Sequence, residues 1–370
     1  MDVAIIGATG SCGRQVAAQL IERSVLQPDA PKDVYLPRTP SVQQPDPAPR
    51  DPDVRIHLVG HAGGAHESEL WGLRADLRDA FDDLAPTIEV GTDVAATGAS
   101  LVVMMAGVTV TRDTKDRAAL AATNRRIFAE SAEAVGAMRD VTVVVQSNPV
   151  ELAVEAFARH VPRGRVLGAA AWSDSLRLRR ELAAELGVRR PMVHAEMWGQ
   201  HGDHLVPIWS LVRARGVSEQ HLADVIGATR EGRALRDLPD EIREARSHAL
   251  ELITDGDVVG ALVHIQSRPP DVRAAVKPFF IHFTAGRTTE LATARSVVDV
   301  VEFIAKGVSA AIPAQVVLDG EYAGLTGPIA VPVLTDPSGW SQVVGEPIAD
   351  DEVAALRAAG AAIAEANAAG

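Results

Sequence analysis

The amino-acid sequence predicts an α/β fold, with a doubly wound parallel sheet in the first half of the chain and a mixed α+β domain in the second. Three observations support this prediction. Short apolar segments alternate with longer stretches of helical spacing up to about residue 150, as consecutive βαβ units do. A glycine-rich loop follows the first apolar segment, and the alternation becomes irregular after residue 150. The two predicted domains are therefore residues 1–150 and 151–370, with their junction at 149–162.

The strands and helices of the first half are expected where the sequence shows their periods. A strand that is buried on both faces of a parallel sheet reads as a short, nearly continuous apolar run, and such runs occupy residues 3–6, 54–59, 87–90, 101–105 and 141–146. Apolar residues recur with helical spacing over residues 12–22, 68–81 and 116–138. Residues 27–53 are rich in proline and polar side chains, so they are expected to form a partly disordered surface insertion.

The second half is expected to mix strands and helices. Residues 194–198 and 259–265 are predicted to be strands, and the apolar run at 279–283 is expected to end in a turn at Gly286. Helical spacing extends over most of residues 218–254 and returns at 297–310. The chain ends in a predicted helix that begins near residue 350.

Composition restricts the class of protein. The chain has 370 residues, 47% of them hydrophobic, and a formal net charge of −13, which argues against a nucleic-acid partner because phosphate backbones attract basic surfaces. No apolar run reaches the length of a membrane span, and the N-terminus lacks a basic-then-apolar leader. The single cysteine, Cys12, excludes an internal disulfide and a thiolate metal cluster. These features predict a soluble, cytoplasmic enzyme.

The glycine loop after the first predicted strand has the composition of a dinucleotide site. Gly7, Gly10 and Gly13 are spaced along the loop, and Ser11 and Cys12 lie between the last two. Small residues let the backbone amides at the start of the next helix approach a pyrophosphate. These five residues are therefore predicted to bind the pyrophosphate of a dinucleotide.

Short-chain reductases and epimerases begin with a similar loop, so that class needs a separate test. Those enzymes use a tyrosine that is followed four positions later by a lysine. Here the two tyrosines, Tyr35 and Tyr322, are followed at that distance by Thr39 and Thr326. The sequence therefore lacks the proton donor of that chemistry.

Three side chains in the second half supply the groups that interconvert a 2-oxo acid and a 2-hydroxy acid. Asp174 and Arg177 are spaced i and i+3, which places both on one face of a helix, and His201 follows in the glycine-rich segment 199–203. A histidine held in one tautomer by a carboxylate can transfer a proton to or from the substrate oxygen. An arginine can bind the substrate carboxylate through two parallel hydrogen bonds. We predict His201 as the acid/base, Asp174 as its partner and Arg177 as the substrate anchor.

The order of these motifs resembles the lactate and malate dehydrogenase family over most of the chain. Besides the glycine loop and the Asp-Arg-His set, the resemblance rests on residues 102–108, 147–150, 317–322 and 327–332 and on the terminal helix. It implies a Rossmann domain over 1–150 that binds the dinucleotide, and a substrate domain over 151–370. It also implies hydride transfer between the nicotinamide and the carbon that carries the 2-oxo or 2-hydroxy group.

The resemblance implies further substrate contacts. Arg117 matches the arginine of a mobile loop that polarises the substrate carbonyl, and Arg112 lies near the second arginine that malate-type members use for a distal carboxylate. Asn148 matches an asparagine whose amide bonds the substrate oxygen, and the Pro149 that follows is expected in a cis turn. Thr288 matches a position in the pocket wall.

The remaining cofactor contacts that the resemblance implies lie mainly where predicted strands end. They are Gly60, His61, Ala106, Gly107, Asn124 and Asn148. NAD enzymes usually place an acid at the end of the second strand to bind the ribose hydroxyls, but here that strand ends in Gly60. An alternative second strand at 33–36 ends in Pro37-Arg38-Thr39 and offers no carboxylate either. The sequence therefore slightly favours NADP, or use of both cofactors, over strict NAD, and binding of NAD through other contacts stays open.

Malate and oxaloacetate are the substrate pair that the resemblance favours first. The altered mobile loop and the residues Trp172 and Ser173 depart from the family pattern, so a different 2-oxo acid from a specialised pathway stays open. A non-catalytic nucleotide-binding regulatory protein is the alternative from another class, and the joint presence of Asp174, Arg177 and His201 argues against it. The resemblance implies a homodimer or homotetramer. No metal site is expected, because the glycine-rich turn around His201 offers no closed set of ligands.

Overall fold

The structure is a computed structural model that describes residues 1–27, 54–61, 65–82, 84–108, 117–286 and 289–368. The side chains of residues 65 and 117–120 are outside this description. Several predictions fall on the remaining residues: most of the insertion at 27–53, the alternative strand at 33–36, and the substrate contacts Arg112 and Thr288. For Arg117 the backbone is described and the side chain is not.

Six parallel strands form the first part of the central sheet. They are β1 (Val3–Ile6), β2 (Arg55–Val59), β3 (Thr87–Gly91), β4 (Leu101–Met104), β5 (Thr142–Val145) and β6 (Val166–Gly168). Their order is β3-β2-β1-β4-β5-β6, the doubly wound order of a dinucleotide-binding domain. The first five confirm the strands predicted from sequence, whereas β6 was not predicted. Since Ile6 pairs with both Val59 and Met104, strands β1, β2 and β4 end level with one another.

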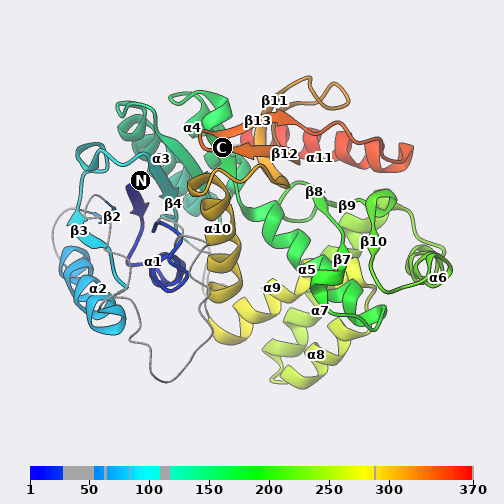
Figure 1. The fold of residues 1–370 in the computed structure, drawn as a ribbon. Helices are drawn as coiled ribbons and strands as arrows, with labels where there is room; N and C mark the ends of the chain where they lie inside the picture. Colours follow the sequence, from blue (N-terminus) through cyan, green and yellow to red (C-terminus); the bar gives the residue numbers. More distant parts are fainter. Residues whose placement is uncertain (28–53, 62–64, 83, 109–116, 287–288, 369–370) are drawn as a thin grey trace, which may run out of the picture.

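Helices cover both faces of these strands (Figure 1). They are α1 (Ser11–Glu22), α2 (Ala65–Phe81), α3 (Arg117–Gly136) and α4 (Val150–Ala158). Successive side chains of a strand point to opposite faces, and β1 shows the result. Val3 and Ile5 belong to one apolar cluster with α1 and α2, whereas Ala4 and Ile6 belong to another with α3 and α4. Burial on both faces explains why these strands read as continuous apolar runs.

Antiparallel strands extend the same sheet into the second half of the chain. The path from β6 runs through β11 (Ala311–Asp319), β12 (Thr326–Asp336), β8 (Met197–Gly199) and β9 (Leu205–Pro207), and β13 (Gly339–Val343) pairs with β12. A separate small sheet joins β7 (Val193–His194) and β10 (Arg213–Ala214). The sheet thus links the strands of the glycine loop with the β8–β9 connection, which carries His201.

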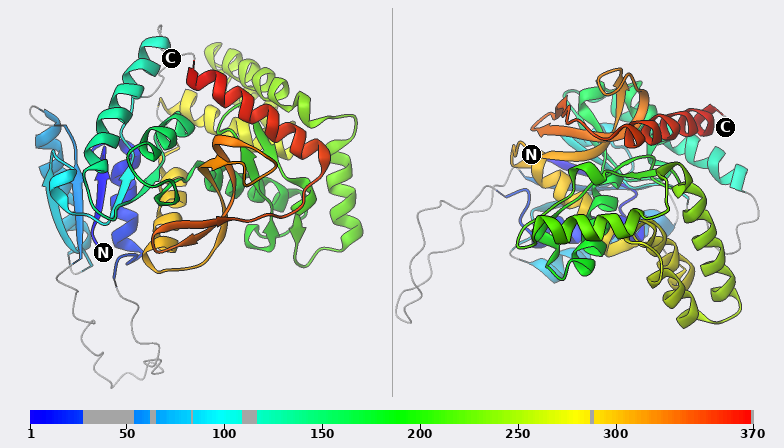
Figure 2. Two further views of the ribbon diagram at one scale, coloured as in Figure 1. Left: turned by 90° about the horizontal axis from the view of Figure 1, so that it is seen from above. Right: turned by 90° about the vertical axis from the view of Figure 1, so that its right-hand side faces the viewer.

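The helices of the second half surround this extension. They are α5 (Ala170–Glu185), α6 (Glu219–Arg230), α7 (Leu238–Thr254), α8 (Val258–Gln266), α9 (Pro270–Ala285), α10 (Glu290–Ala305) and α11 (Asp350–Ala368). Helix α11 packs on β8, β9 and β12 (Figures 1 and 2). Helices α5, α7 and α9 share an apolar cluster, and on α5 the buried Glu181 binds Arg273 and Lys277 of α9 at 3.0 and 2.5 Å. Within the described ranges, no helix is long and apolar enough to cross a membrane.

Helix α10 connects the cores of the two halves. Its residues Val297, Val301 and Ile304 are fully buried in the same apolar cluster as α1, and Arg23 at the end of α1 binds Asp299 of α10 at 2.8 Å. Helix α10 lies between α1 and α5 (Figure 1). The second half of the sequence therefore completes one face of the parallel sheet.

One element predicted for the second half was wrong. Residues 259–265 form helix α8 rather than a strand, because short apolar runs alone do not distinguish the two. The side chain of Asp257 accepts a hydrogen bond from the N–H of Gly260 at 2.8 Å and so caps this helix.

Other elements of the second half differ from prediction in their bounds. The predicted strand at 194–198 is two short strands, β7 and β8, which belong to different sheets. The helix predicted at 297–310 is α10, which begins earlier and ends at Ala305. The apolar run at 279–283 lies in helix α9 and ends, as predicted, at a left-handed Gly286 with φ of 68°. The predicted helices over 218–254 and from residue 350 are confirmed.

The tight packing of α1 on the glycine loop leads to a prediction about stability. A Cβ at Gly13 would lie 2.3 Å from the carbonyl oxygen of Gly7 and 2.9 Å from Cα of Ala8, so the helix would have to move. We expect Gly13→Ala to lower the free energy of unfolding by about 1–3 kcal/mol, the usual cost of overpacking. Urea denaturation followed by circular dichroism measures this change.

Gly72→Ala is a matched control for that substitution. Gly72 lies within α2, and a Cβ there would meet nothing within 4 Å. Since alanine is the better helix former, we expect a gain of about 0.5–1 kcal/mol. If Gly13→Ala were as stable as Gly72→Ala, the close approach of α1 to the loop would be wrong.

Candidate active site

The structure brings together the side chains of the predicted catalytic pair, His201 and Asp174, and of the predicted substrate anchor, Arg177. His201 Nδ1 lies 2.6 Å from Asp174 Oδ2, and Arg177 Nη1 donates to the other oxygen, Asp174 Oδ1, at 2.8 Å. Asp174 is buried, whereas the His201 side chain is 23% exposed. Because Nδ1 is bound to Asp174, Nε2 is the ring nitrogen that can face a substrate.

Local structure explains how these residues meet. Helix α5 presents Asp174 and Arg177 one turn apart, and its neighbouring Ser175 accepts a hydrogen bond from the N–H of Met197 on β8 at 2.9 Å. The chain then turns between β8 and β9, where Gly199 has φ of +83° and a Cβ would lie 2.7 Å from the carbonyl oxygen of His204. Only glycine fits this position without strain. The turn therefore places His201 directly beside α5.

Helix α7 also binds the turn between β8 and β9. Asp203 accepts two hydrogen bonds from Arg246 of α7, at 2.6 and 3.1 Å. Parallel bonds between guanidinium and carboxylate constrain orientation as well as distance. The residues that surround His201 are thus fixed by both α5 and α7.

The charges in this cluster shift one another's pKa values. Burial alone would raise the pKa of Asp174, but the charge and hydrogen bond of His201, with help from Arg177, lower it overall. Burial alone would lower the pKa of His201, yet the negative charges of Asp174 and, to a smaller degree, Glu151 raise it above its ordinary value of 6.5. An ionised carboxylate beside a readily protonated imidazole is the charge state that acid/base catalysis requires.

Sequence reasoning missed Glu151. Its side chain is buried, and Oε1 accepts a hydrogen bond from the backbone N–H of His201 at 2.7 Å. Burial raises the pKa of this carboxyl, although the hydrogen bond from His201 opposes the shift. Glu151 directly follows the Asn148-Pro149-Val150 motif, so extending the motif by one residue would have included it.

Sequence reasoning also missed Thr289, which contacts the predicted substrate anchor. Arg177 Nη2 donates to Thr289 Oγ1 at 3.1 Å, and Thr289 in turn lies 3.0 Å from Thr293 Oγ1. The predicted pocket residue was its neighbour Thr288, which is outside the described part of the chain. A guanidinium has five N–H donors. The hydrogen bonds from Arg177 to Asp174 and Thr289 orient the guanidinium and leave other N–H groups for a substrate carboxylate.

The loops after β4 and β5 are tied together by Asn124 of α3. Its Oδ1 accepts from the N–H of Val108 at 2.6 Å, and its Nδ2 donates to the carbonyl oxygens of Val108 and Asn148, each at 2.9 Å. This side chain therefore positions the loops that carry Ala106, Gly107 and Asn148. Asn148 is exposed, and its bond to Pro149 is cis, as predicted.

The glycine loop has the geometry that a dinucleotide needs. Gly7 has φ of +83°, and a Cβ there would lie 2.6 Å from the backbone nitrogen of Ala106, so the loops after β1 and β4 are in direct contact. Helix α1 begins at Ser11 after Gly10, with no side-chain cap and no acidic residue in its first turn. Its positive end is thus open to a phosphate group. Ser11 and Cys12 lie in this first turn, half-buried.

The end of β2 carries no acidic residue. The strand stops at Val59 and is followed by Gly60 and an exposed His61. A Cβ at Gly60 would lie 3.0 Å from Cδ1 of Leu70, so packing against α2 favours a small residue here. Strand β2 lies next to β1 in the sheet, so the strand that ends without a carboxylate is the second strand of the parallel sheet.

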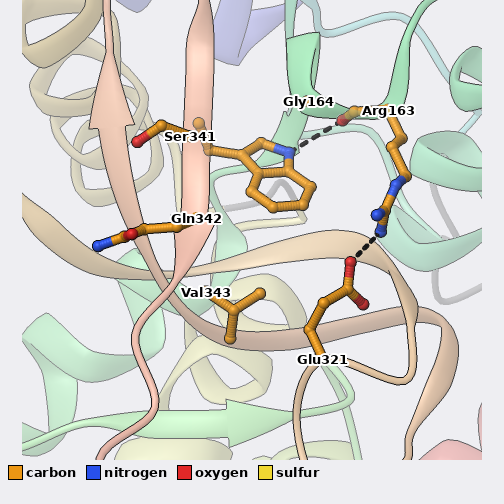
Figure 3. Close-up of a pocket in the computed structure, with 7 residues that line it drawn as sticks. Arg163, Gly164, Glu321, Ser341, Gln342 and Val343 are labelled. Carbon is orange, nitrogen blue, oxygen red and sulfur yellow. Dashed lines mark hydrogen bonds and ion pairs between the residues drawn. The ribbon is translucent and has the colours of Figure 1, made fainter.

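Figure 3 shows a surface cavity of about 430 Å³ that is separate from this cluster. It is lined by Trp340 and by the ion pair of Arg163 and Glu321, with Nη1 and Oε1 2.5 Å apart. None of the predicted site residues lines it, and its only two charged side chains neutralise each other. In the described ranges, no group of three or more His, Cys, Asp or Glu residues is arranged to hold a metal ion.

Comparison with known proteins gives consistent results. Residues 1–168 match the family model described as the lactate/malate dehydrogenase NAD binding domain. The L-lactate dehydrogenase B chain of Mus musculus is 25% identical over 297 residues, which cover 79% of each chain. That of Alligator mississippiensis is 26% identical over 222 residues, which are 59% of this chain and 56% of that one, so this match spans just over half of the relative. These comparisons support NAD and give no support to the expected preference for NADP.

Solved structures show the same fold over the whole chain. The malate dehydrogenase of Aeropyrum pernix superposes with a TM-score of 0.73 at 20% identity and covers 99% of this chain and 97% of its own. The minor L-lactate dehydrogenase of Enterococcus mundtii superposes with a TM-score of 0.72 at 20% identity and covers 100% and 98%. Residues 1–168 thus resemble an NAD binding domain of the lactate/malate dehydrogenase type, and the whole chain shares its fold with malate and lactate dehydrogenases.

Proposed function

We propose that this protein interconverts a 2-oxo acid and a 2-hydroxy acid with NAD as cofactor and His201 as the acid/base. The observation that carries the proposal is the shared carboxylate of Asp174, which binds His201 through one oxygen and Arg177 through the other. A regulatory protein without turnover would have no need for a proton-transferring imidazole beside a substrate-binding guanidinium.

His201 and Arg177 perform complementary tasks in this scheme. During reduction, Nε2 of the protonated imidazole donates its proton to the substrate carbonyl oxygen, and Asp174 stabilises the positive charge beforehand. During oxidation the same nitrogen takes the proton from the hydroxyl group. Arg177 binds the substrate carboxylate through its remaining N–H groups, and Thr289 keeps the guanidinium in place. The asparagine amide of Asn148 and the guanidinium of Arg117 are proposed to bind the reacting oxygen.

The loops after β1 and β4 are proposed to hold the cofactor. The start of α1, at Gly10 to Gly13, would bind the pyrophosphate of the cofactor. Ala106 and Gly107 would contact the rest of the dinucleotide. When bound, the nicotinamide supplies or accepts the hydride. Since residues 60–66, which directly follow β2, include no carboxylate, other groups would bind the ribose hydroxyls.

Oxaloacetate and malate are the substrate pair that we propose to test first. Relatives and structural neighbours are named as both L-lactate and malate dehydrogenases. Pyruvate is therefore the matched comparison, and bulkier 2-oxo acids test the specialised alternative that the altered mobile loop suggests.

An absorbance assay at the nicotinamide band tests the proposed function. Purified protein is mixed with NADH or NADPH and with oxaloacetate, pyruvate or a bulkier 2-oxo acid. We expect NADH to be oxidised with at least one of these acids, fastest with oxaloacetate. Turnover of only a bulkier acid would keep the mechanism and change the substrate. Cofactor binding without any turnover would contradict the proposed activity.

The raised pKa of His201 predicts opposite pH dependences for the two directions. Reduction needs the protonated imidazole, so its kcat/KM should fall as pH rises through a pKa above 6.5, whereas oxidation should increase over the same range. His201→Asn should lower kcat by about 10²- to 10⁴-fold and abolish the pH dependence of both reduction and oxidation, while NADH still binds. A reduction rate that rises with pH in this range would exclude His201 as the acid.

Arg177→Lys should chiefly impair substrate binding, because an ammonium group cannot form two parallel hydrogen bonds with a carboxylate. We expect kcat/KM for the 2-oxo acid to fall by about 10- to 100-fold, the value of lost hydrogen bonds to a charged group. Arg180→Lys is the matched control, because Arg180 lies on the same helix with its side chain 69% exposed. Equal kinetics of the two variants would show that Arg177 is not the anchor.

A further inference from the structure

We propose that Glu151 is a positioning residue of the active site, whose carboxylate fixes the main chain of His201 and supplies a second negative charge that keeps the imidazole protonated. This inference rests on the proposed role of His201 as the acid/base. It assigns a function to a buried acidic side chain that the mechanism above does not use.

The position of Glu151 at the start of α4 favours this role. Val150 is the first residue of the helix, so Glu151 is the second, and it is the acidic residue of the first turn. The positive end of a helix stabilises a negative charge placed there. The carboxylate also receives hydrogen bonds from its own backbone N–H and from that of His201, the latter at 2.7 Å. These hydrogen bonds favour the ionised side chain and oppose its burial, which on balance raises the pKa of Glu151; only 3% of the residue is exposed.

The contact with the main chain complements the contact with the ring. Asp174 on α5 binds Nδ1 of His201, and Glu151 on α4 binds the backbone nitrogen of the same residue. Two helices thus hold one residue at two separate points. The ring and the main chain of the catalytic residue are therefore both fixed, which reduces the motion of Nε2 relative to the substrate.

The charges that face His201 come from two helices. Helix α5 contributes Asp174 and Arg177, whose charges act in opposite directions, and helix α4 contributes Glu151, which raises the pKa of the imidazole. On the turn itself, Asp203 is paired with Arg246 of α7. Arg177 offsets part of the effect of Asp174, and the charge of Glu151 adds a smaller contribution that favours the imidazolium form.

The test is the pKa of His201 in full-length Glu151→Gln, measured by NMR from the imidazole Cε1–H resonance. That resonance is assigned by its loss in His201→Asn. Glutamine keeps an oxygen that can accept the hydrogen bond but removes the charge. We expect the pKa of His201 to fall by about one unit and the descending limb of the reduction pH profile to move to lower pH by the same amount.

Two further variants complete the experiment. Glu155→Gln removes the same charge from the same helix at a residue that binds Arg159 and Asn367 instead, so it should leave the pKa of His201 unchanged. Glu151→Asp keeps the negative charge, so the pKa of His201 in this variant should stay close to its value in the unmodified protein. Thermal unfolding and NADH binding verify that each variant is folded.

The outcome distinguishes this inference from the proposed function. An unchanged pKa of His201 in folded Glu151→Gln, or an equal shift in Glu155→Gln, would overturn the role of Glu151. Because the NMR titration needs no substrate, it gives this answer even if no 2-oxo acid is turned over. Absence of turnover in the unmodified protein would instead count against the proposed function alone.

Discussion

A buried carboxylate with two charged partners is the interaction on which the active site depends. Asp174 is 4% exposed, and an isolated charge at such a position costs several kcal/mol. Here one oxygen binds the imidazole of His201 and the other binds the guanidinium of Arg177. Because both bonds originate from one rigid group, the tautomer of the acid/base and the orientation of the substrate anchor are set together. Loss of either partner would leave a charge that burial strongly disfavours.

This interaction requires that helix α5 and the β8–β9 turn keep a constant distance, and several contacts of different kinds maintain it. The hydroxyl of Ser175 joins α5 to β8, and Arg246 binds the turn from α7. The left-handed Gly199 allows the turn to close. Helix α10 packs against both α1 and α5, so the same core that supports the glycine loop also supports the helix that carries Asp174.

Predictability from sequence differed among elements for physical reasons. The five predicted strands of the parallel sheet were confirmed because strands buried on both faces need continuous apolar runs. Helix α8 was predicted as a strand because its apolar residues form a run too short to show a helical period, and its capping residue Asp257 lies before that run. Asp174, Arg177 and His201 were identified because their chemistry depends on residue type. Glu151 and Thr289 were missed because their roles depend on what they touch.

By itself, the sequence determined which residues can perform the chemistry and which segments must be buried. The glycine loop, the i, i+3 pair on α5 and the histidine in its glycine-rich turn carry this information locally, since residue type and spacing are sufficient. Only the tertiary structure decided how the charges combine. Contacts such as Glu151 to His201 and Arg177 to Thr289 join residues 50 and 112 positions apart. The direction of each pKa shift follows from the balance of burial and neighbouring charge, and that balance exists only after the chain has folded.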